Sequence, residues 1–221
     1  MNILYEDNDI LAVHKPAGLA TQTSRLGEKD LFSEAKNYVG GKYIGIINRL
    51  DQPVEGIVLM AKSSSVAAKL EAQIQNHSME KYYRAHVYLD EKKKAELVNI
   101  TDRSSSFSHK IECFLCRDKN NTSRICSPDE PDAKEARLEY SIREITEHEA
   151  LLDIHLLTGR HHQIRVQLAG EGLPLLGDRK YGSQESITYS TNANVRFVAL
   201  CAYRLVFVHP TTKKKLDIVF H

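Results

Sequence analysis

The chain has 221 residues, of which 42% are hydrophobic and 27% charged, and its formal net charge is +1. This composition is typical of a folded protein and excludes a disordered or strongly polybasic chain. No apolar run approaches the ~20 residues that a membrane-spanning helix needs, and residues 1–7 lack the zones of a signal peptide. We therefore expect a cytoplasmic protein that does not enter a membrane.

The first ninety residues are predicted to alternate between short strands and helices. Hydrophobic periodicity and turn formers predict strands at residues 3–5, 10–13, 44–47, 56–61 and 82–89, and helices at 31–39 and 63–77. Ser63 offers a cap for the second helix, in which Val66, Leu70 and Ile74 recur at helical spacing. Alternation in the last strand places Tyr83 on its apolar face.

The second half of the chain is predicted to be mostly strands. Residues 90–134 are polar and are interpreted as an insertion with a hairpin around 118–121 followed by a loose loop. Paired strands are predicted at 137–145 and 150–157, a short amphipathic helix at 162–170, a loop at 172–182, and strands at 197–208 and 215–220. Because few helices are long enough for crossovers, the pattern favours an α+β fold with a largely antiparallel sheet in one domain, residues 1–221.

Four cysteines raise the question of metal binding. Cys113 and Cys116 form a C-x-x-C pair with Cys126 nearby, so a zinc site can be drawn. A second C-x-x-C is absent from the sequence, and the alternation of Ile111, Cys113 and Leu115 is typical of one strand face, where cysteine acts as a small hydrophobe. No secretion signal accompanies the cysteines. We therefore expect neither a metal site nor a disulfide framework.

Three stretches place charged or aromatic residues beside apolar runs: residues 48–51 (Asn-Arg-Leu-Asp), 81–85 (Lys-Tyr-Tyr-Arg-Ala) and 158–168 (Thr-Gly-Arg-His-His-Gln-Ile-Arg-Val-Gln-Leu). Each has an ordinary structural explanation when it is taken alone. Asp51 could cap a turn before Pro53, the tyrosines could be core residues of a strand, and Arg165 could be a surface charge on a helix.

Together, and in this order, the three stretches resemble the RluA-type pseudouridine synthases. That family has the patterns H-R-L-D-x-x-T-S-G, K-x-Y-x-A, T-G-R-x-H-Q-I-R-x-x-L and G-x-P-x-x-G-D-x-x-Y-G. The last pattern matches residues 172–182, and the Lys-Pro-Ala-Gly at 15–18 and the His-Pro at 209–210 also match. The resemblance covers nearly the whole chain, from about Ile3 to the C-terminus.

The sequence departs from the family pattern beside these residues. Asn48 stands where the family usually has His, and Val54-Glu55 where it has Thr-Ser. His161 replaces Thr, and Leu200-Cys201 replaces Leu-His. These departures bear on the choice of substrate more than on the reaction. No S4-like RNA-binding extension precedes Ile3, so we expect the catalytic domain itself to direct the protein to its target.

The resemblance implies an RNA uridine isomerase that needs no cofactor, because pseudouridylation involves no net redox change. Asp51 would be the nucleophile that attacks C1′ or the ring, or would assist elimination to a glycal. Tyr83 would stack on the base and relay the C5 proton, and Arg165 would keep the carboxylate ionised. Arg49 would take the place of a flipped uridine. Further substrate or RNA contacts are assigned to Leu50, Lys15, Arg160, His162, Gln163 and Leu168.

The partner implied is ribosomal RNA or tRNA, bound by a monomer. One alternative is a catalytically inactive RNA-binding homologue, against which the intact Asp51, Tyr83 and Arg165 argue. Another is a hydrolase that uses Asp51 with a second carboxylate, for which Glu55 is the nearest candidate in the sequence.

Overall fold

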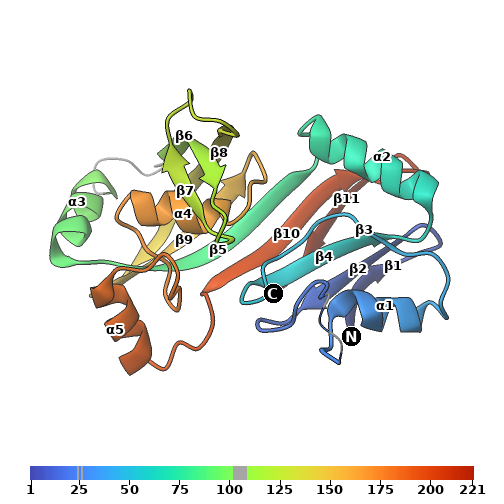
Figure 1. Cartoon of the computed structure of the whole chain (residues 1–221), viewed down its shortest axis with the longest axis horizontal. Coiled ribbons are helices and arrows are strands. Elements are labelled where there is room, and N and C mark those ends of the chain that lie inside the picture. The colour runs from blue at the N-terminus through green and yellow to red at the C-terminus, as the bar shows by residue number, and fades with distance from the viewer. Residues whose placement is uncertain (24, 26, 102–108) are drawn as a thin grey trace. The chain divides into compact units, whose positions relative to one another are not determined.

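The computed structural model describes residues 1–23, 25, 27–101 and 109–221. The chain divides into two units, one formed by Met1–Lys81 with Cys201–His221 and the other by Tyr82–Leu200. Figure 1 shows the helices and strands of both. The predicted α+β class with a largely antiparallel, mixed sheet is confirmed, whereas the assignment of residues 1–221 to a single catalytic domain stays a prediction.

The first unit contains β1 (Asn2–Glu6), β2 (Ile10–Lys15), α1 (Leu31–Tyr38), β3 (Gly45–Ile46), β4 (Glu55–Ala61), α2 (Ser64–Gln75), β10 (Leu200–Val208) and β11 (Lys215–Val219). Its strands follow the order β1-β2-β4-β10-β11, and β3 also pairs with β4. The β10–β4 pairing is parallel, and the other pairings in this unit are antiparallel.

The core of the first unit lies between α2 and the strands. Apolar residues of β2, β4, β10 and β11 meet the helix residues Val66, Ala67 and Leu70 in one buried cluster. Ser63 caps α2 as predicted, because its hydroxyl accepts a hydrogen bond from Val66 N. Gly56 allows β10 to approach β4, since a β-carbon at this position, where φ is +131°, would lie 2.4 Å from Ala202 O.

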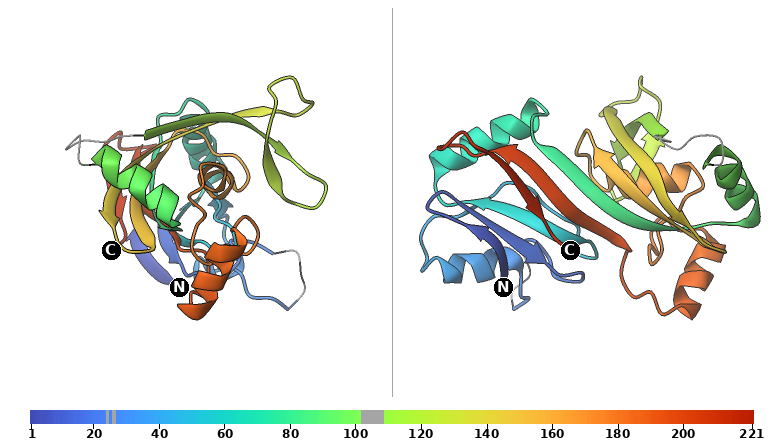
Figure 2. Two further views of the ribbon diagram at one scale, coloured as in Figure 1. Left: turned by 90° about the vertical axis from the view of Figure 1, so that its left-hand side faces the viewer. Right: turned by 180° about the vertical axis from the view of Figure 1, so that it is seen from behind.

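The second unit contains β5 (Glu80–Tyr88), α3 (Glu91–Thr101), β6 (His109–Arg117), β7 (Ser123–Cys126), β8 (Lys134–Ile145), β9 (Glu149–Leu156), α4 (Gln163–Gly170) and α5 (Gln184–Asn192). Its strands follow the antiparallel order β5-β9-β8-β6-β7. Figure 2 shows β6 and β7 as a hairpin, which confirms the turn predicted around 118–121.

Three local predictions for the second unit are wrong. Residues 91–101 form helix α3 instead of a loop, because the Asp90 carboxylate caps the helix at Lys93 N; residues 102–108 of this predicted insertion lie outside the described residues. Helix α4 is not amphipathic, since Gln163, Arg165 and Gln167 are buried together with the apolar residues between them. Cys116 and Cys126 form a disulfide, because the β6–β7 register brings their Cα atoms within 5.9 Å.

Candidate active site

The predicted nucleophile Asp51 lies in a loop of residues 48–54, the Asp51 loop, between β3 and β4. The side chain of Asn48 begins this loop by bonding to the backbone of β4: Asn48 Nδ2 donates to Ile57 O (3.0 Å) and Asn48 Oδ1 accepts from Leu59 N (2.7 Å). The carboxamide thus extends the β3–β4 pairing, because beyond the end of β3 a side chain makes hydrogen bonds to the backbone of β4. An amide suits the position because it offers a donor and an acceptor at once.

Further hydrogen bonds hold the loop on both sides of Asp51. The backbone of Leu50 is bound by Thr21, and Gln52 O accepts from Gly18 N (2.8 Å). A turn closes within the loop, where Val54 N donates to Asp51 O (3.0 Å). Asp51 itself is half-buried, and these hydrogen bonds fix the backbone of the loop that carries it.

Lys15 lies at the end of β2, beneath the Asp51 loop. Its side chain has no exposed surface, and its Nζ donates to Pro16 O (3.0 Å), Leu19 O (2.7 Å) and Gln52 O (3.1 Å). Burial lowers the pKa of Lys15 to about 8, although the charges of Asp51 and Glu55 act in the opposite direction. The ammonium therefore lies close enough to Asp51 to interact with it electrostatically.

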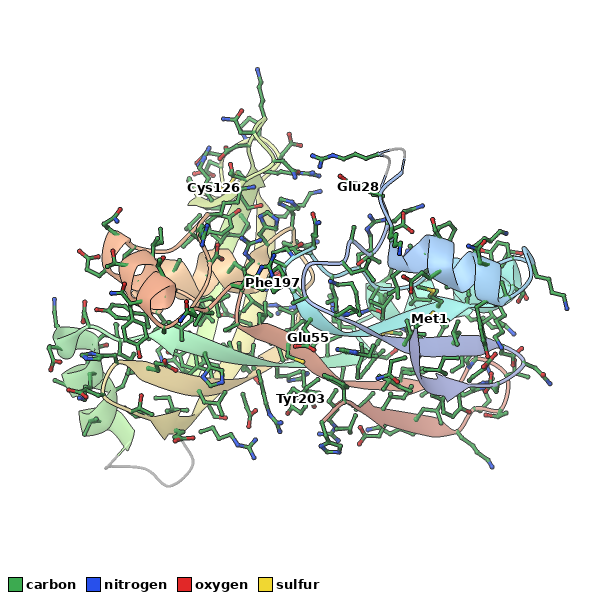
Figure 3. The ribbon with its side chains drawn as sticks, turned by 90° about the horizontal axis from the view of Figure 1, so that it is seen from below. Met1, Glu28, Glu55, Cys126, Phe197 and Tyr203 are labelled. Carbon is green, nitrogen blue, oxygen red and sulfur yellow. A yellow bond between two sulfur atoms is a disulfide. The ribbon has the colours of Figure 1, made fainter. Side chains whose placement is uncertain are left out.

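Arg49 and Glu55, on either side of Asp51 in the sequence, each contact a polar side chain. Arg49 is exposed, and its guanidinium donates to Gln22 Oε1 (3.0 Å). Glu55, labelled in Figure 3, lies at the start of β4, and one of its carboxylate oxygens is 2.8 Å from His14 Nε2. The carboxylate considered as a second acid is therefore engaged with a histidine.

In the second unit, Tyr83 lies on β5 opposite Ile154 of β9. It shares its face with Ala85 and Val87, as predicted, and all three are buried. Its neighbour Tyr82 is on the other face, where its ring stacks on that of His155 at 4.6 Å. The strand register thus separates the two tyrosines.

The segment from Thr158 to Gln163 is folded around one buried amide. Gln163 Oε1 accepts from Thr158 Oγ1 (2.8 Å) and from Arg160 N (3.0 Å), while Gln163 Nε2 donates to a backbone carbonyl of β8. Gln163 therefore holds the turn before α4, and its buried side chain has no surface to offer RNA. Arg160 is exposed and donates to Glu135 O (2.8 Å).

His162 precedes α4 with a left-handed backbone, φ +53°, which is uncommon for a residue with a β-carbon. Its Nδ1 lies 2.7 Å from Tyr181 Oη, and this hydroxyl also accepts from Ser123 N of β7 (2.9 Å). His161 stacks on His162 and contacts the Ser123 hydroxyl. A strained backbone conformation persists where several surrounding contacts hold it in place, and these hydrogen bonds and ring contacts hold that of His162.

Arg165 forms a buried bidentate ion pair with Asp178. The Nε–Oδ2 distance is 2.7 Å and the Nη2–Oδ1 distance is 2.8 Å, with the two side chains 6% and 1% exposed. Burial alone would raise the pKa of Asp178, but the Arg165 charge and the backbone N–H groups of Lys180 and Tyr181 outweigh it and lower that pKa. The Arg165 guanidinium also lies 5.1 Å from the centre of the Tyr181 ring.

A groove of about 480 Å³ lies between the β6–β7 hairpin and the loop before α4. Its lining includes the basic residues Arg117, Lys119, Lys134, Arg160 and His161, together with Asp118 and Asp132. Leu168, assigned above to substrate binding, is fully buried within α4, so a contribution from it would come through packing and not through direct contact.

The structure gathers the expected site residues into two groups. Lys15, Arg49, Leu50 and Asp51 lie in the first unit, and Tyr83, Arg160, His162, Gln163, Arg165 and Leu168 lie in the second. That Asp51 forms one active site with Tyr83 and Arg165 stays a prediction. In the part of the chain that the structure describes, no group of three or more His, Cys, Asp or Glu residues is placed to hold a metal ion.

Three residues that structure the site received no role from the sequence: Thr21, Asp178 and Tyr181. Asp178 and Tyr181 fall inside the stretch 172–182 that carries the family resemblance, so their positions in that motif were a usable signal. Thr21 lies in a polar segment without periodicity, and only the tertiary structure reveals its contact with Leu50.

Comparison with known proteins agrees with the sequence motifs. Residues 9–170 match the model of the family described as RNA pseudouridylate synthase. The tRNA pseudouridine synthase C of Pasteurella multocida is 30% identical over 99% of this chain and 90% of its own length. The ribosomal large subunit pseudouridine synthase D of Zymomonas mobilis is 28% identical over 98% of this chain and 68% of its own length.

The fold also has a solved counterpart. The structure of human RNA pseudouridylate synthase domain containing 1 superposes with a TM-score of 0.76 and 17% identity, covering 100% of this chain and 82% of the human one. The chain spans about two thirds of the length of several curated relatives that it matches. No helix within the described residues combines the length and apolar character needed to span a membrane.

Proposed function

Because the chain belongs to the RNA pseudouridylate synthase family, we propose that it isomerises uridines in RNA to pseudouridine. The observation that carries this proposal is the Asp51 loop, in which a half-buried carboxylate stands on a backbone anchored at Asn48, Leu50 and Gln52. A turn residue would not need so many anchors. A reacting carboxylate does, because catalysis depends on fixed geometry.

The reaction breaks the bond between uracil N1 and ribose C1′, rotates the base, and joins C5 to C1′. Asp51 acts either as a nucleophile that attacks C1′ or the uracil ring, or as the base that assists elimination to a glycal. Tyr83 packs against the base and relays the proton released from C5. Arg165 provides positive charge that keeps Asp51 ionised while its pairing with Asp178 fixes the guanidinium. None of these steps requires a cofactor.

RNA binding uses the exposed Arg49 and the basic groove beside the hairpin. Arg49 stacks in the place of the flipped uridine, which must leave its helix before Asp51 can reach it. The groove offers Arg117, Lys119, Lys134 and Arg160 to the phosphate backbone, whose contacts supply most of the affinity of such complexes. Similar proteins are named for ribosomal RNA and for tRNA, so the substrate belongs to one of these classes. We propose that the protein acts as a cytoplasmic monomer.

The test is direct measurement of pseudouridine. Purified protein is incubated with transcribed tRNA and ribosomal RNA, and nucleosides are separated by liquid chromatography and identified by mass spectrometry. Asp51→Asn keeps the shape of the side chain but removes the nucleophile, so we expect activity to fall on the order of 10⁴-fold or more. The melting temperature and the affinity for RNA should stay close to those of the wild type.

Three outcomes distinguish the alternatives. Pseudouridine formation by the wild type and its loss in Asp51→Asn support the proposal. RNA binding without any pseudouridine, on either class of RNA, supports an inactive RNA-binding homologue. Isomerisation by Asp51→Asn at near the wild-type rate would remove Asp51 from the mechanism. Mapping pseudouridines in RNA from a deletion strain then identifies the modified position.

A further inference from the structure

We propose that Thr21 and Lys15 are positioning residues that hold the Asp51 loop in its reactive geometry, an inference that rests on the proposed function of Asp51. Neither side chain touches the reacting atoms in this proposal. Each acts on the backbone of a residue adjacent to Asp51: Thr21 on Leu50 and Lys15 on Gln52.

Thr21 binds both backbone groups of Leu50. Its hydroxyl donates to Leu50 O (2.8 Å) and accepts from Leu50 N (3.2 Å), so one side chain replaces the two bonds that a neighbouring strand would make. Thr21 is only 3% exposed, which shields both bonds from water. A hydroxyl can do this because it carries one donor and two acceptor positions.

Thr21 is itself held by helix α1. Its carbonyl accepts from Phe32 N (3.0 Å), and the preceding carbonyl of Ala20 accepts from Leu31 N (3.0 Å). The Asp30 carboxylate caps the helix at Ser33 N (2.6 Å) and also accepts from Thr23 N (2.9 Å). A continuous path of hydrogen bonds therefore leads from the start of α1 through Thr21 to the residue before Asp51.

Lys15 completes the support from the other side. An ammonium has three N–H donors, and the three carbonyls of Pro16, Leu19 and Gln52 are within hydrogen-bond distance of them. With every donor engaged and no exposed surface, Lys15 is poorly suited to the RNA contact expected from its motif. Its role is to join the segment after β2 to the Asp51 loop.

Both contacts therefore act on the backbone of the residues that flank Asp51. The backbones of Leu50 and Gln52 are bound by polar side chains that come from two other segments of the first unit. Such support sets where the carboxylate stands, and a displacement of about 1 Å in a reacting group can reduce turnover about 10²-fold. Loss of support should therefore lower kcat and leave KM nearly unchanged.

The experiment compares Thr21→Val, which removes both bonds at nearly constant volume, with Thr21→Ser, which keeps them. The matched control is Thr23→Val, because the described hydrogen bonds of the Thr23 hydroxyl are to Glu28 and Arg25, two exposed residues of its own turn. We expect Thr21→Val to lose roughly 10- to 100-fold in kcat with KM within about two-fold, Thr21→Ser to recover most of it, and Thr23→Val to match the wild type. A wild-type kcat in Thr21→Val, or a loss confined to KM, overturns the role of Thr21.

Lys15 gives a pH-dependent readout. The charged groups that interact with it are Asp51 of the loop and Glu55 of β4. As pH rises through about 8, the ammonium becomes an amine with one donor fewer, and the kcat of the wild type should fall. In a plot of kcat against pH, Lys15→Met should have a low kcat that does not fall further at alkaline pH. Thr21→Val should still show the alkaline fall, which is called the alkaline limb below. A limb that survives unchanged in Lys15→Met contradicts the role of Lys15.

Hydrogen exchange separates this inference from the proposed function. Amide exchange in peptides covering residues 48–54 should be faster in Thr21→Val than in Thr23→Val or the wild type, whether or not any RNA is modified. Unchanged exchange in these peptides overturns the inference and leaves the function standing. A wild-type protein that forms no pseudouridine overturns the function, while the exchange result still decides whether Thr21 holds the loop.

Discussion

The Asp51 loop and helix α4 immobilise a charged side chain by opposite means. Around Asp51, polar side chains bind the backbone on both sides and leave the carboxylate half-buried. In α4, the charge of Arg165 is itself buried and held by a carboxylate of opposite sign. The first arrangement fixes the backbone that carries the charged group. The second fixes the charged group itself, through its ion pair with Asp178.

This difference has an energetic consequence. A hydrogen bond between a neutral hydroxyl and the backbone contributes about 0.5–1.5 kcal/mol to stability, so several weak bonds together hold the Asp51 loop. Removing one partner of a buried ion pair leaves the other charge uncompensated and is far more damaging. The Arg165 region should therefore respond to single substitutions by losing stability, whereas the Asp51 loop should respond mainly by losing activity.

The largest expected effect is that of Asp178→Asn, which leaves the Arg165 guanidinium buried without its paired carboxylate. We expect the free energy of unfolding to fall by about 3–5 kcal/mol. The control is Asp217→Asn, which breaks a similar bidentate pair with Arg204 (2.6 and 2.8 Å) whose side chains are 46% and 38% exposed. That exposed pair should be worth at most about 1 kcal/mol. Denaturant unfolding at neutral pH measures both, and equal losses would contradict the contrast between buried and exposed pairs.

The same pair predicts a dependence on pH. The folded-state pKa of Asp178 lies below its ordinary value of 3.8, so its stabilising contribution is complete above that value and is lost as pH falls through the lower one. The difference in unfolding free energy between the wild type and Asp178→Asn should therefore narrow as the pH falls through 3.8 and below it. Unfolding curves across this range test it, and a constant difference would mean that the Asp178 carboxylate does not control the effect.

The disulfide tests whether the rigidity of the Arg165 region depends on the β6–β7 hairpin. Cys116 and Cys126 are ten residues apart, and closing such a loop stabilises a protein by up to about 3 kcal/mol. Ser123, at the start of the strand β7 that ends at Cys126, contacts both His161 and Tyr181. Reduction should therefore lower stability and increase hydrogen exchange in residues 158–165. Cys126→Ser provides the control, because its stability and exchange should not respond to the reductant.

The sequence was informative where its signals are local. Alternation placed Tyr83 on the buried face of β5, and Ser63 marked the start of α2. The order of the motifs also identified the family, because motif residues are fixed by chemistry and not by propensity. The division of the expected site residues between two units could not be read in this way, since sequence patterns carry no information on long-range packing.

The errors arose where tertiary contacts decide the outcome. Helix α4 was expected to expose one face, but its polar residues find partners inside: Gln167 Nε2, for example, donates to Ala136 O (3.0 Å). Helix α3 has a charged sequence that suggested a loop, although Asp90 was a visible cap. The disulfide depends on the register of a hairpin, which the spacing of the cysteines in the sequence could not reveal.

Arg49 gives the smallest expected change in stability and the sharpest test of the Asp51 loop as a site for RNA. Its side chain is exposed and makes a hydrogen bond to Gln22, so Arg49→Ala should change the free energy of unfolding by no more than about 0.5 kcal/mol. If Arg49 replaces a flipped uridine, the variant should modify a structured stem-loop less well than a short unstructured RNA, because unstacking costs a few kcal/mol only in the former. The control is Arg25→Ala, which removes another exposed arginine of the same unit. Initial rates of pseudouridine formation on both RNAs decide the matter: equal losses on the two substrates would leave Arg49 with a general electrostatic role, since a phosphate contact does not distinguish a stacked uridine from a free one.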